Sequence, residues 1–168
     1  MAVKFFPIFF EDVIGLEPVP LNSIWIATPL VQSLFTILVE RFANKTNRFA
    51  AMILFKTVGI CQLLVMATVT MQVTKYANVI TVVAYVVRTG AMNCAYPLER
   101  AVVMDHVEKK DRGKWNALES INSTVWTLSA ALGGYLVAEV GYRNIYFITA
   151  SVYTFAVLLV VPLNCITK

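Results

Sequence analysis

Charged residues are scarce in this sequence and unevenly placed. They make up 14% of its 168 residues, against about a quarter in an average soluble domain. Residues 145–163 contain no charge, residues 49–71 contain only Lys56, and residues 115–138 contain only Glu119. A stretch of about 20 apolar residues is long enough to cross the roughly 30 Å hydrocarbon core of a bilayer as a helix. Several such stretches in succession exclude a soluble domain, with or without a single membrane anchor.

Cysteine and histidine are also rare. The three cysteines, Cys61, Cys94 and Cys165, have no paired spacing, which argues against a disulfide framework or a cysteine metal site. His106 is the single histidine, and no metal-ligand spacing, glycine-rich phosphate loop or nucleophile motif accompanies it. We therefore expect no metal, no cofactor and no enzymatic activity.

The apolar stretches predict an all-α fold, a polytopic bundle of transmembrane helices that forms one domain over residues 1–168. Residues 1–10 are apolar too, but ten residues extend only about 15 Å as a helix, which is half a span. The chain is thus predicted to begin with a partial helix, as if a helix had been cut in its middle. The predicted full spans are residues 21–38, 49–71, 79–104, 115–138 and 145–163.

Basic residues in the predicted loops favour one face of the membrane. Eight Lys and Arg residues lie in loop 40–48, in loop 105–114 and at the C-terminus, against two, Lys75 and Arg143, in the opposite loops. Cytoplasmic loops carry an excess of Lys and Arg, so the first group is predicted to be cytoplasmic. This bias also accounts for the net charge of +4, and no nucleic-acid partner is indicated. A glycan on the sequon at Asn44 would overturn the orientation.

A series of short motifs follows in order along residues 88–147. An intramembrane Arg and a Gly precede an Asp at the predicted cytoplasmic end, a basic loop with Arg-Gly, a helix with a Gly pair, and an outer aromatic-Arg pair. In this order and spacing the motifs resemble the major facilitator superfamily of transporters. The residues that carry the resemblance are Arg88, Gly90, Asp105, Arg112-Gly113, Gly133-Gly134 and Tyr142-Arg143.

A second motif supports the resemblance. Residues 36–45, TILVERFANK, are similar to the short cytoplasmic loop motif of that superfamily, with Thr36, Glu40 and Ala43 in place of Gly, Asp and Gly. The resemblance implies that the chain holds the last five helices of a carrier and the end of the seventh. The solute path of such a carrier lies between two halves. The implied partners are therefore the lipid bilayer, a small solute, and a missing N-terminal half or a second copy.

Four charged residues inside the predicted spans are candidates for the solute path or for ion coupling. Arg88 lies near the middle of its span, where a charge costs at least about 2.5–3.5 kcal/mol, and a structural contact within the bundle is the alternative reading. Glu99 would share the face of Arg88 on a continuous helix, and Arg100 follows it. Tyr96-Pro97 predicts a kink in that helix. Lys56 lies about two turns inside its helix, where snorkelling to the interface is the alternative.

Other charges gather at the predicted cytoplasmic face. A network there could hold the inner helix ends together in one state and release them in another, while simple solvation of loop charges is the alternative. The candidates for this gating network are Glu40, Arg41, Asp105, Arg112 and Glu119. Gly90, Gly133 and Gly134 are read as helix-packing positions, because small residues let helices approach closely in lipid.

Two functions fit these patterns. The first is transport of a small solute by alternating access, as part of a secondary carrier, with proton coupling through Glu99 or Glu119 left open. The second is a truncated, transport-inactive membrane protein, or a scaffold that binds another helix bundle. Both are multi-pass integral membrane proteins, and the sequence favours neither the plasma membrane nor an organelle.

Overall fold

The computed structural model describes residues 6, 9–69 and 75–166, and all regular structure within them is helical. The prediction of an all-α bundle is confirmed. Most of the predicted partial span (residues 1–5 and 7–8) and Lys168 lie outside the described residues. The helices are α2 (Pro18–Lys45), α3 (Arg48–Val69), α4 (Lys75–Asn93), α5 (Tyr96–His106) and α6 (Arg112–Ile166), with a short π-helix η2 (Phe9–Val13) and a 3-10 turn η3 (Lys109–Asp111).

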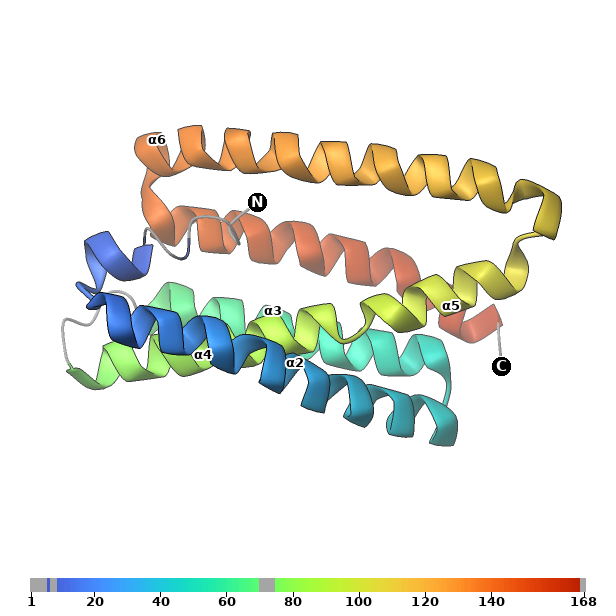
Figure 1. Cartoon of the computed structure of the whole chain (residues 1–168), viewed down its shortest axis with the longest axis horizontal. Coiled ribbons are helices and arrows are strands. Elements are labelled where there is room, and N and C mark those ends of the chain that lie inside the picture. The colour runs from blue at the N-terminus through green and yellow to red at the C-terminus, as the bar shows by residue number, and fades with distance from the viewer. Residues whose placement is uncertain (1–5, 7–8, 70–74, 167–168) are drawn as a thin grey trace.

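Helix α3 lies at the centre of the bundle. It packs against α4 and against α6, and α2 packs against α4. Figure 1 shows these helices running side by side along the long axis of the molecule. The buried residues of α3 include Ala51, Gly59 and Ala67, whose small side chains let neighbouring helices approach. Gly90 of α4 plays the same part against α2, because a Cβ there would lie 3.1 Å from both Phe35 Cδ2 and Val31 Cγ1.

The predicted span 79–104 is broken into two helices, α4 and α5. Helix α4 ends at Asn93, and α5 starts at Tyr96 with Pro97 in its first turn. Proline has no backbone N–H, and its ring clashes with the carbonyl four residues earlier, which here belongs to Asn93. The predicted kink is confirmed as a short break at Cys94 and Ala95, where Ala95 keeps helical angles of φ −76° and ψ −18°. Arg88 and Glu99 therefore lie on either side of this break, in α4 and α5.

Helix α6 consists of two arms that reverse direction at Gly141. This residue has φ 78° and ψ 162°, a region that only glycine occupies readily. Figure 1 shows the first arm (residues 112–140) running antiparallel to the second arm (residues 142–166), with the reversal at one end of the molecule. The predicted loop between the last two spans is thus a turn at one glycine, and each arm corresponds to one predicted span.

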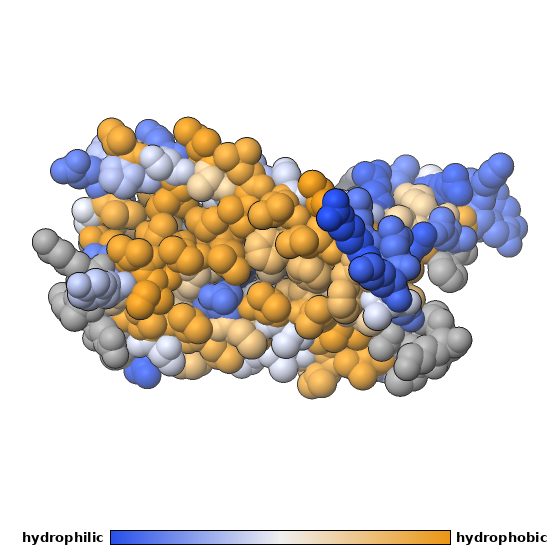
Figure 2. All heavy atoms as spheres, turned by 90° about the horizontal axis from the view of Figure 1, so that it is seen from below, coloured by the Kyte–Doolittle hydropathy of each residue, from blue (hydrophilic) through white to orange (hydrophobic). Residues whose placement is uncertain are grey.

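Four helical segments among the described residues have the length and apolar composition needed to cross a membrane. The fourth comprises 54 residues, which would extend about 80 Å if straight, so its two arms account for the difference from the five full spans predicted. Figure 2 shows apolar side chains covering the middle of one face, with hydrophilic ones gathered mainly at one end. The segments are Pro18–Lys45, Arg48–Val69, Tyr76–Asp105 and Lys109–Pro162.

An aromatic cluster fills the space between α4 and the second arm of α6. Phe6, Phe9 and Phe10 bring three rings, each 1% exposed, from the N-terminal segment. The Phe6 ring centroid lies 4.5 Å from that of Tyr85 and 5.6 Å from that of Tyr146. The described part of the predicted partial span therefore packs as core. It also covers Arg88, as described below.

Candidate functional site

Arg88 lies inside the bundle, in the middle of the α4 segment that faces the aromatic cluster. Its side chain is 2% exposed. The carbon of the guanidinium group lies 5.6 Å from the ring centroid of Phe6 and 6.0 Å from that of Tyr153. The charge also interacts with Tyr85 and Tyr146. Arg88 is therefore enclosed by aromatic side chains from the N-terminal segment, α4 and the second arm of α6.

No carboxylate forms an ion pair with Arg88 among the residues that the structure describes. Its Nε atom is buried without a hydrogen-bond partner, and so are the hydroxyl groups of Tyr146 and Thr149 on the second arm of α6. Tyr146, Thr149 and Tyr153 recur at the spacing of one helix face. We refer to Arg88 with Phe6, Tyr85, Tyr146 and Tyr153, the aromatic residues that surround its charge, as the Arg88 cluster.

Lys56 and Glu99 form an ion pair between α3 and α5. Their side chains are 29% and 37% exposed, and they line one side of a pocket of about 290 Å³ whose other walls are apolar. Pairing lowers the cost of holding either charge within the span of a helix. Two of the four candidates for the solute path are thus joined to each other, and neither joins Arg88.

Arg100 and Glu119 form a second pair, between α5 and the first arm of α6. The Arg100 Nη2 atom lies 3.7 Å from Glu119 Oε2, and the Tyr96 hydroxyl donates a hydrogen bond of 2.5 Å to Glu119 Oε1. These three side chains also line a pocket of about 310 Å³ between the two helices, together with Glu99 and Trp115. Glu119 therefore contacts Arg100, one of the candidates for the solute path, and lies apart from Asp105, with which the sequence analysis grouped it.

The first arm of α6 carries a polar stripe. Its members recur at positions i, i+4, i+7 and i+11, the spacing of one face of a helix. All are exposed, and the first three line an open cavity of about 700 Å³ together with Tyr96, Arg100 and Glu119. The hydroxyl groups of Ser120 and Thr127 donate to backbone carbonyls four residues earlier, which leaves their oxygens free to accept. The polar stripe consists of Asn116, Ser120, Ser123 and Thr127.

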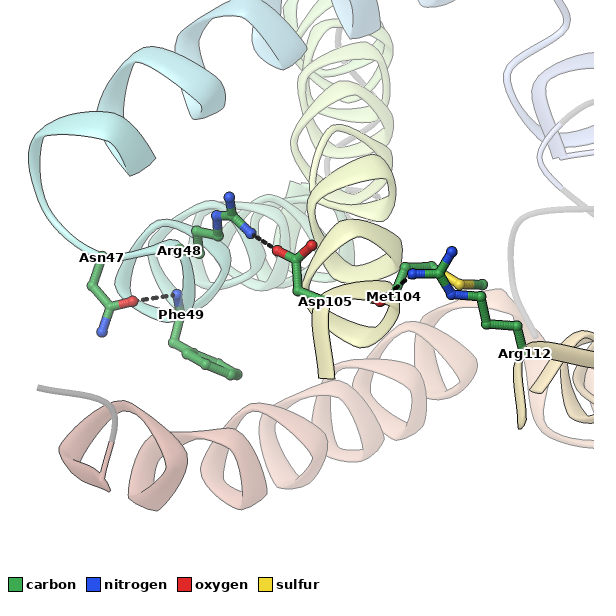
Figure 3. Close-up of polar contacts among 6 residues, drawn as sticks. All are labelled: Asn47, Arg48, Phe49, Met104, Asp105 and Arg112. Atoms are coloured by element: carbon green, nitrogen blue, oxygen red, sulfur yellow. Dashed lines mark hydrogen bonds and ion pairs between the residues drawn. The ribbon is translucent and has the colours of Figure 1, made fainter. Parts of the chain in front are cut away.

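Asp105 pairs with Arg48, which the sequence placed only in a basic loop. The Arg48 Nη1 atom donates to Asp105 Oδ2 over 2.6 Å, between the start of α3 and the end of α5. Figure 3 shows this contact beside that of Arg112, whose Nη2 donates to the Met104 carbonyl over 3.4 Å. The end of α5 is therefore held from both sides.

Glu40 and Arg41 lie near the end of α2, and neither takes part in an ion pair among the residues that the structure describes. Glu40 and Arg41 are exposed, so solvation satisfies both charges. Gly133 is buried and Gly134 half-buried within the first arm of α6. The structure thus brings Asp105 and Arg112 to the same helix end, while it leaves Glu40, Arg41 and Glu119 apart from them.

Three kinds of residue at these sites were missed by reasoning from the sequence. Arg48 was counted in a loop, although its predicted membrane face is that of Asp105. Tyr96 was read only as part of a kink. Tyr146 and Thr149 lie in a span without charges, and their recurrence on one face of an apolar helix was the available signal.

A comparison with protein families gives one match, which covers nearly the whole chain. The sequence model described as Major Facilitator Superfamily matches residues 5–164. The chain belongs to the major facilitator superfamily. It is accordingly a multi-pass integral membrane protein of a family of membrane transporters. No curated protein and no solved structure matches the chain.

Three of the superfamily motifs lie at junctions of the fold. Asp105 lies at the end of α5, Arg112-Gly113 opens α6, and Tyr142-Arg143 follows the reversal at Gly141. These three motifs therefore sit where one membrane-crossing helix gives way to the next, whereas Gly133-Gly134 lies inside the first arm of α6. Arg88 alone among the charged motif residues lies within a helix and out of contact with solvent.

Proposed function

We propose that this chain forms one half of a secondary carrier, which moves a small solute across a membrane by alternating access and has neither enzymatic activity nor a cofactor. The observation that carries the proposal is the polar stripe on the first arm of α6. Exposed amide and hydroxyl groups along a membrane-crossing helix are costly against hydrocarbon. They are expected where a helix faces water, and a solute path is such a place.

The charged residues beside the stripe fit the same role. Arg100, Glu119 and Tyr96 line the same open cavity as the stripe. Lys56 and Glu99 lie on the other side of α5, and Arg88 lies beyond the break between α4 and α5. We assign the Arg100–Glu119 pair to the wall of the path. We assign the Lys56–Glu99 pair to coupling between α3 and α5. Proton coupling through Glu99 or Glu119 is part of this proposal.

The gate in this proposal lies at the end where α2 meets α3 and α5 meets α6. Asp105, Arg48 and Arg112 hold the end of α5 there. The excess of Lys and Arg in loops 40–48 and 105–114 assigns this end, and the C-terminus, to the cytoplasm. The other wall of the path would come from an N-terminal half or from a second copy of the chain, with this chain supplying the last five helices.

Labelling of single cysteines tests the water-filled path. In a background without Cys61, Cys94 and Cys165, Ser123→Cys places a thiol on the stripe, and Val125→Cys is a matched control about 200° around the same helix. Val125 is 56% exposed and would face lipid. We expect a membrane-impermeant maleimide to label Ser123→Cys and not Val125→Cys. Equal labelling of the two positions would contradict the proposal.

The alternative function is a transport-inactive scaffold that binds another helix bundle. The exposed stripe is also what a helix would present to a polar partner helix. In that case Ser123→Cys would stay unlabelled in native membranes and would become labelled after purification. Uptake into vesicles of a sugar, an amino acid, an organic anion and an organic cation, each radiolabelled, gives the second readout. If one is taken up, Arg88→Ala should abolish its uptake, and unchanged uptake would remove Arg88 from the mechanism.

A further inference from the structure

Two neighbouring cavities, of about 310 Å³ and 700 Å³, lie between α5 and the first arm of α6. The larger also holds the first three members of the polar stripe, whereas the smaller has an apolar wall. We refer to the two together as the α5–α6 site. The side chains that line both cavities are Tyr96, Arg100, Glu119 and Asn122. The apolar wall consists of Val103, Trp115 and Leu118.

The ion pair inside the α5–α6 site is loose. Arg100 Nη2 lies 3.7 Å from Glu119 Oε2, whereas a hydrogen-bonded pair of opposite charges is about 2.7–2.9 Å apart. The Arg100 side chain donates no hydrogen bond among the residues that the structure describes, although a guanidinium group carries five N–H donors. Glu119 accepts from the Tyr96 hydroxyl through Oε1 only. Both charged groups therefore keep hydrogen-bonding capacity for a ligand.

We propose that the α5–α6 site binds a zwitterionic α-amino acid with an apolar side chain, and that this amino acid is the solute of the carrier. The second part rests on the proposed transport function. The carboxylate of the ligand pairs with Arg100, whose planar guanidinium group forms parallel hydrogen bonds to such a group. The ammonium group donates to Glu119. The side chain of the ligand lies against the apolar wall of the smaller cavity.

Charge balance favours a zwitterion over other solutes. Glu99 also lines the smaller cavity, but its charge is paired with Lys56 on α3, so one cation and one anion are left for the ligand. A solute with a single charge would take one partner of the Arg100–Glu119 pair and leave the other unbalanced, which is costly within a membrane-crossing segment. A zwitterion replaces one ion pair by two. An uncharged sugar would use neither charge.

The spacing of the pair favours an α-amino acid over a longer zwitterion. One carbon atom separates the ammonium and carboxylate groups of an α-amino acid, so its two charges lie close together. Arg100 and Glu119 are also close, at 3.7 Å. Their side chains are 56% and 30% exposed, so they can turn to admit the ligand without moving either helix.

The experiment compares three ligands that share a phenyl ring. L-phenylalanine carries both charges, 2-phenylethylamine only the ammonium group and 3-phenylpropionate only the carboxylate, while glucose is the uncharged control. Binding to the purified full chain in detergent is measured by saturation-transfer NMR, which detects weak ligands, and empty micelles are the blank. We expect phenylalanine to bind about tenfold or more tightly than either analogue, because each analogue lacks one charged partner. Glucose should not bind.

Two variants test which residue receives which charge. Arg100→Gln should bind phenylalanine no better than 2-phenylethylamine, and Glu119→Gln should bind it no better than 3-phenylpropionate. Each variant should keep the analogue that fits its remaining charge, and this shows that the variant is folded. Lys110→Gln and Glu108→Gln are the matched controls, because these two residues form an exposed ion pair that lines neither cavity. Both controls should bind phenylalanine as the wild type does.

The wild-type ligand series alone can overturn the proposal. It is wrong if phenylalanine does not bind, or if either analogue binds as tightly as phenylalanine. Equal weakening of phenylalanine binding by Arg100→Gln and by Lys110→Gln would also count against it. Uptake of radiolabelled phenylalanine into vesicles separates the site from the transport function. Binding without uptake supports the site and counts against transport by the chain alone, whereas uptake of another solute without phenylalanine binding supports transport and overturns the site.

Discussion

The ion pair between Lys56 and Glu99 offers a quantitative test of how α5 is held. An exposed ion pair contributes about 0.2–1 kcal/mol to stability, whereas breaking a fully buried one costs about 3–5 kcal/mol. The two side chains are 29% and 37% exposed, so solvent screens the pair in part and the expected cost lies between these limits. We expect Lys56→Met, which keeps the length of the side chain and leaves Glu99 unpaired, to lower the free energy of unfolding by about 2 kcal/mol.

A double-mutant cycle isolates the pair from other effects of each substitution. Glu99→Gln alone should lower the free energy of unfolding by a similar amount. The double variant should lower it by about 1–2 kcal/mol less than the sum of the two single substitutions. The assay is unfolding of the purified chain in mixed micelles with increasing dodecyl sulfate, followed by tryptophan fluorescence. Lys45→Met removes an exposed lysine at the end of α2 and should change stability by less than about 0.5 kcal/mol. Additivity of the two single substitutions within about 0.5 kcal/mol would refute the argument.

Four further substitutions test the backbone, the packing and the surface. Gly141→Ala should lower the free energy of unfolding by about 1–3 kcal/mol through backbone strain alone, because nothing lies within 4 Å of the added Cβ. An unchanged melting temperature would contradict the proposed role of Gly141 in the turn. Gly90→Ala should lower the melting temperature through its 3.1 Å contacts with α2, whereas Gly113→Ala, which meets no neighbour, should raise it by up to the helix-propensity gain of about 1 kcal/mol. Asp105→Asn should lower the free energy of unfolding by about 0.2–1 kcal/mol at low salt, since the ion pair between Asp105 and Arg48 is exposed. If the same loss of stability persists in 1 M salt, the pair is not screened by solvent as argued.

Features of the fold that depend on local sequence, such as the membrane-crossing helices and the break near Pro97, could be predicted. Long runs without charge predicted membrane-crossing helices because lipid admits few other backbones. Pro97 predicted a disturbance at the right place because its missing N–H acts locally. The depth of that disturbance could not be predicted, since the break also involves Cys94 and Ala95, which are fully buried by neighbouring helices. Tertiary packing of this kind leaves no local pattern.

The charged residues inside the membrane-crossing helices could be predicted from the sequence, whereas their partners could not. Charges inside spans stand out because they are rare, which is why Arg88, Lys56 and Glu99 were found. Their partners depend on the rotation and depth of each helix, which a sequence does not specify. Glu119 was therefore grouped with Asp105, although the structure gives it to Arg100 and Tyr96.

Helix α5 gathers the polar contacts that join the rest of the bundle. Glu99 and Asp105 tie it to α3, while Arg100 and Tyr96 tie it to Glu119 on the first arm of α6. The break after Asn93 separates α5 from the straight continuation of α4. Arg88 lies before that break and depends on Phe6 and the second arm of α6 instead. The bundle thus has two polar centres on separate helical segments. If α5 moves as one body, it can exchange its partners on α3 and α6 while the contacts around Arg88 stay in place, as a gate formed by α5 alone would require.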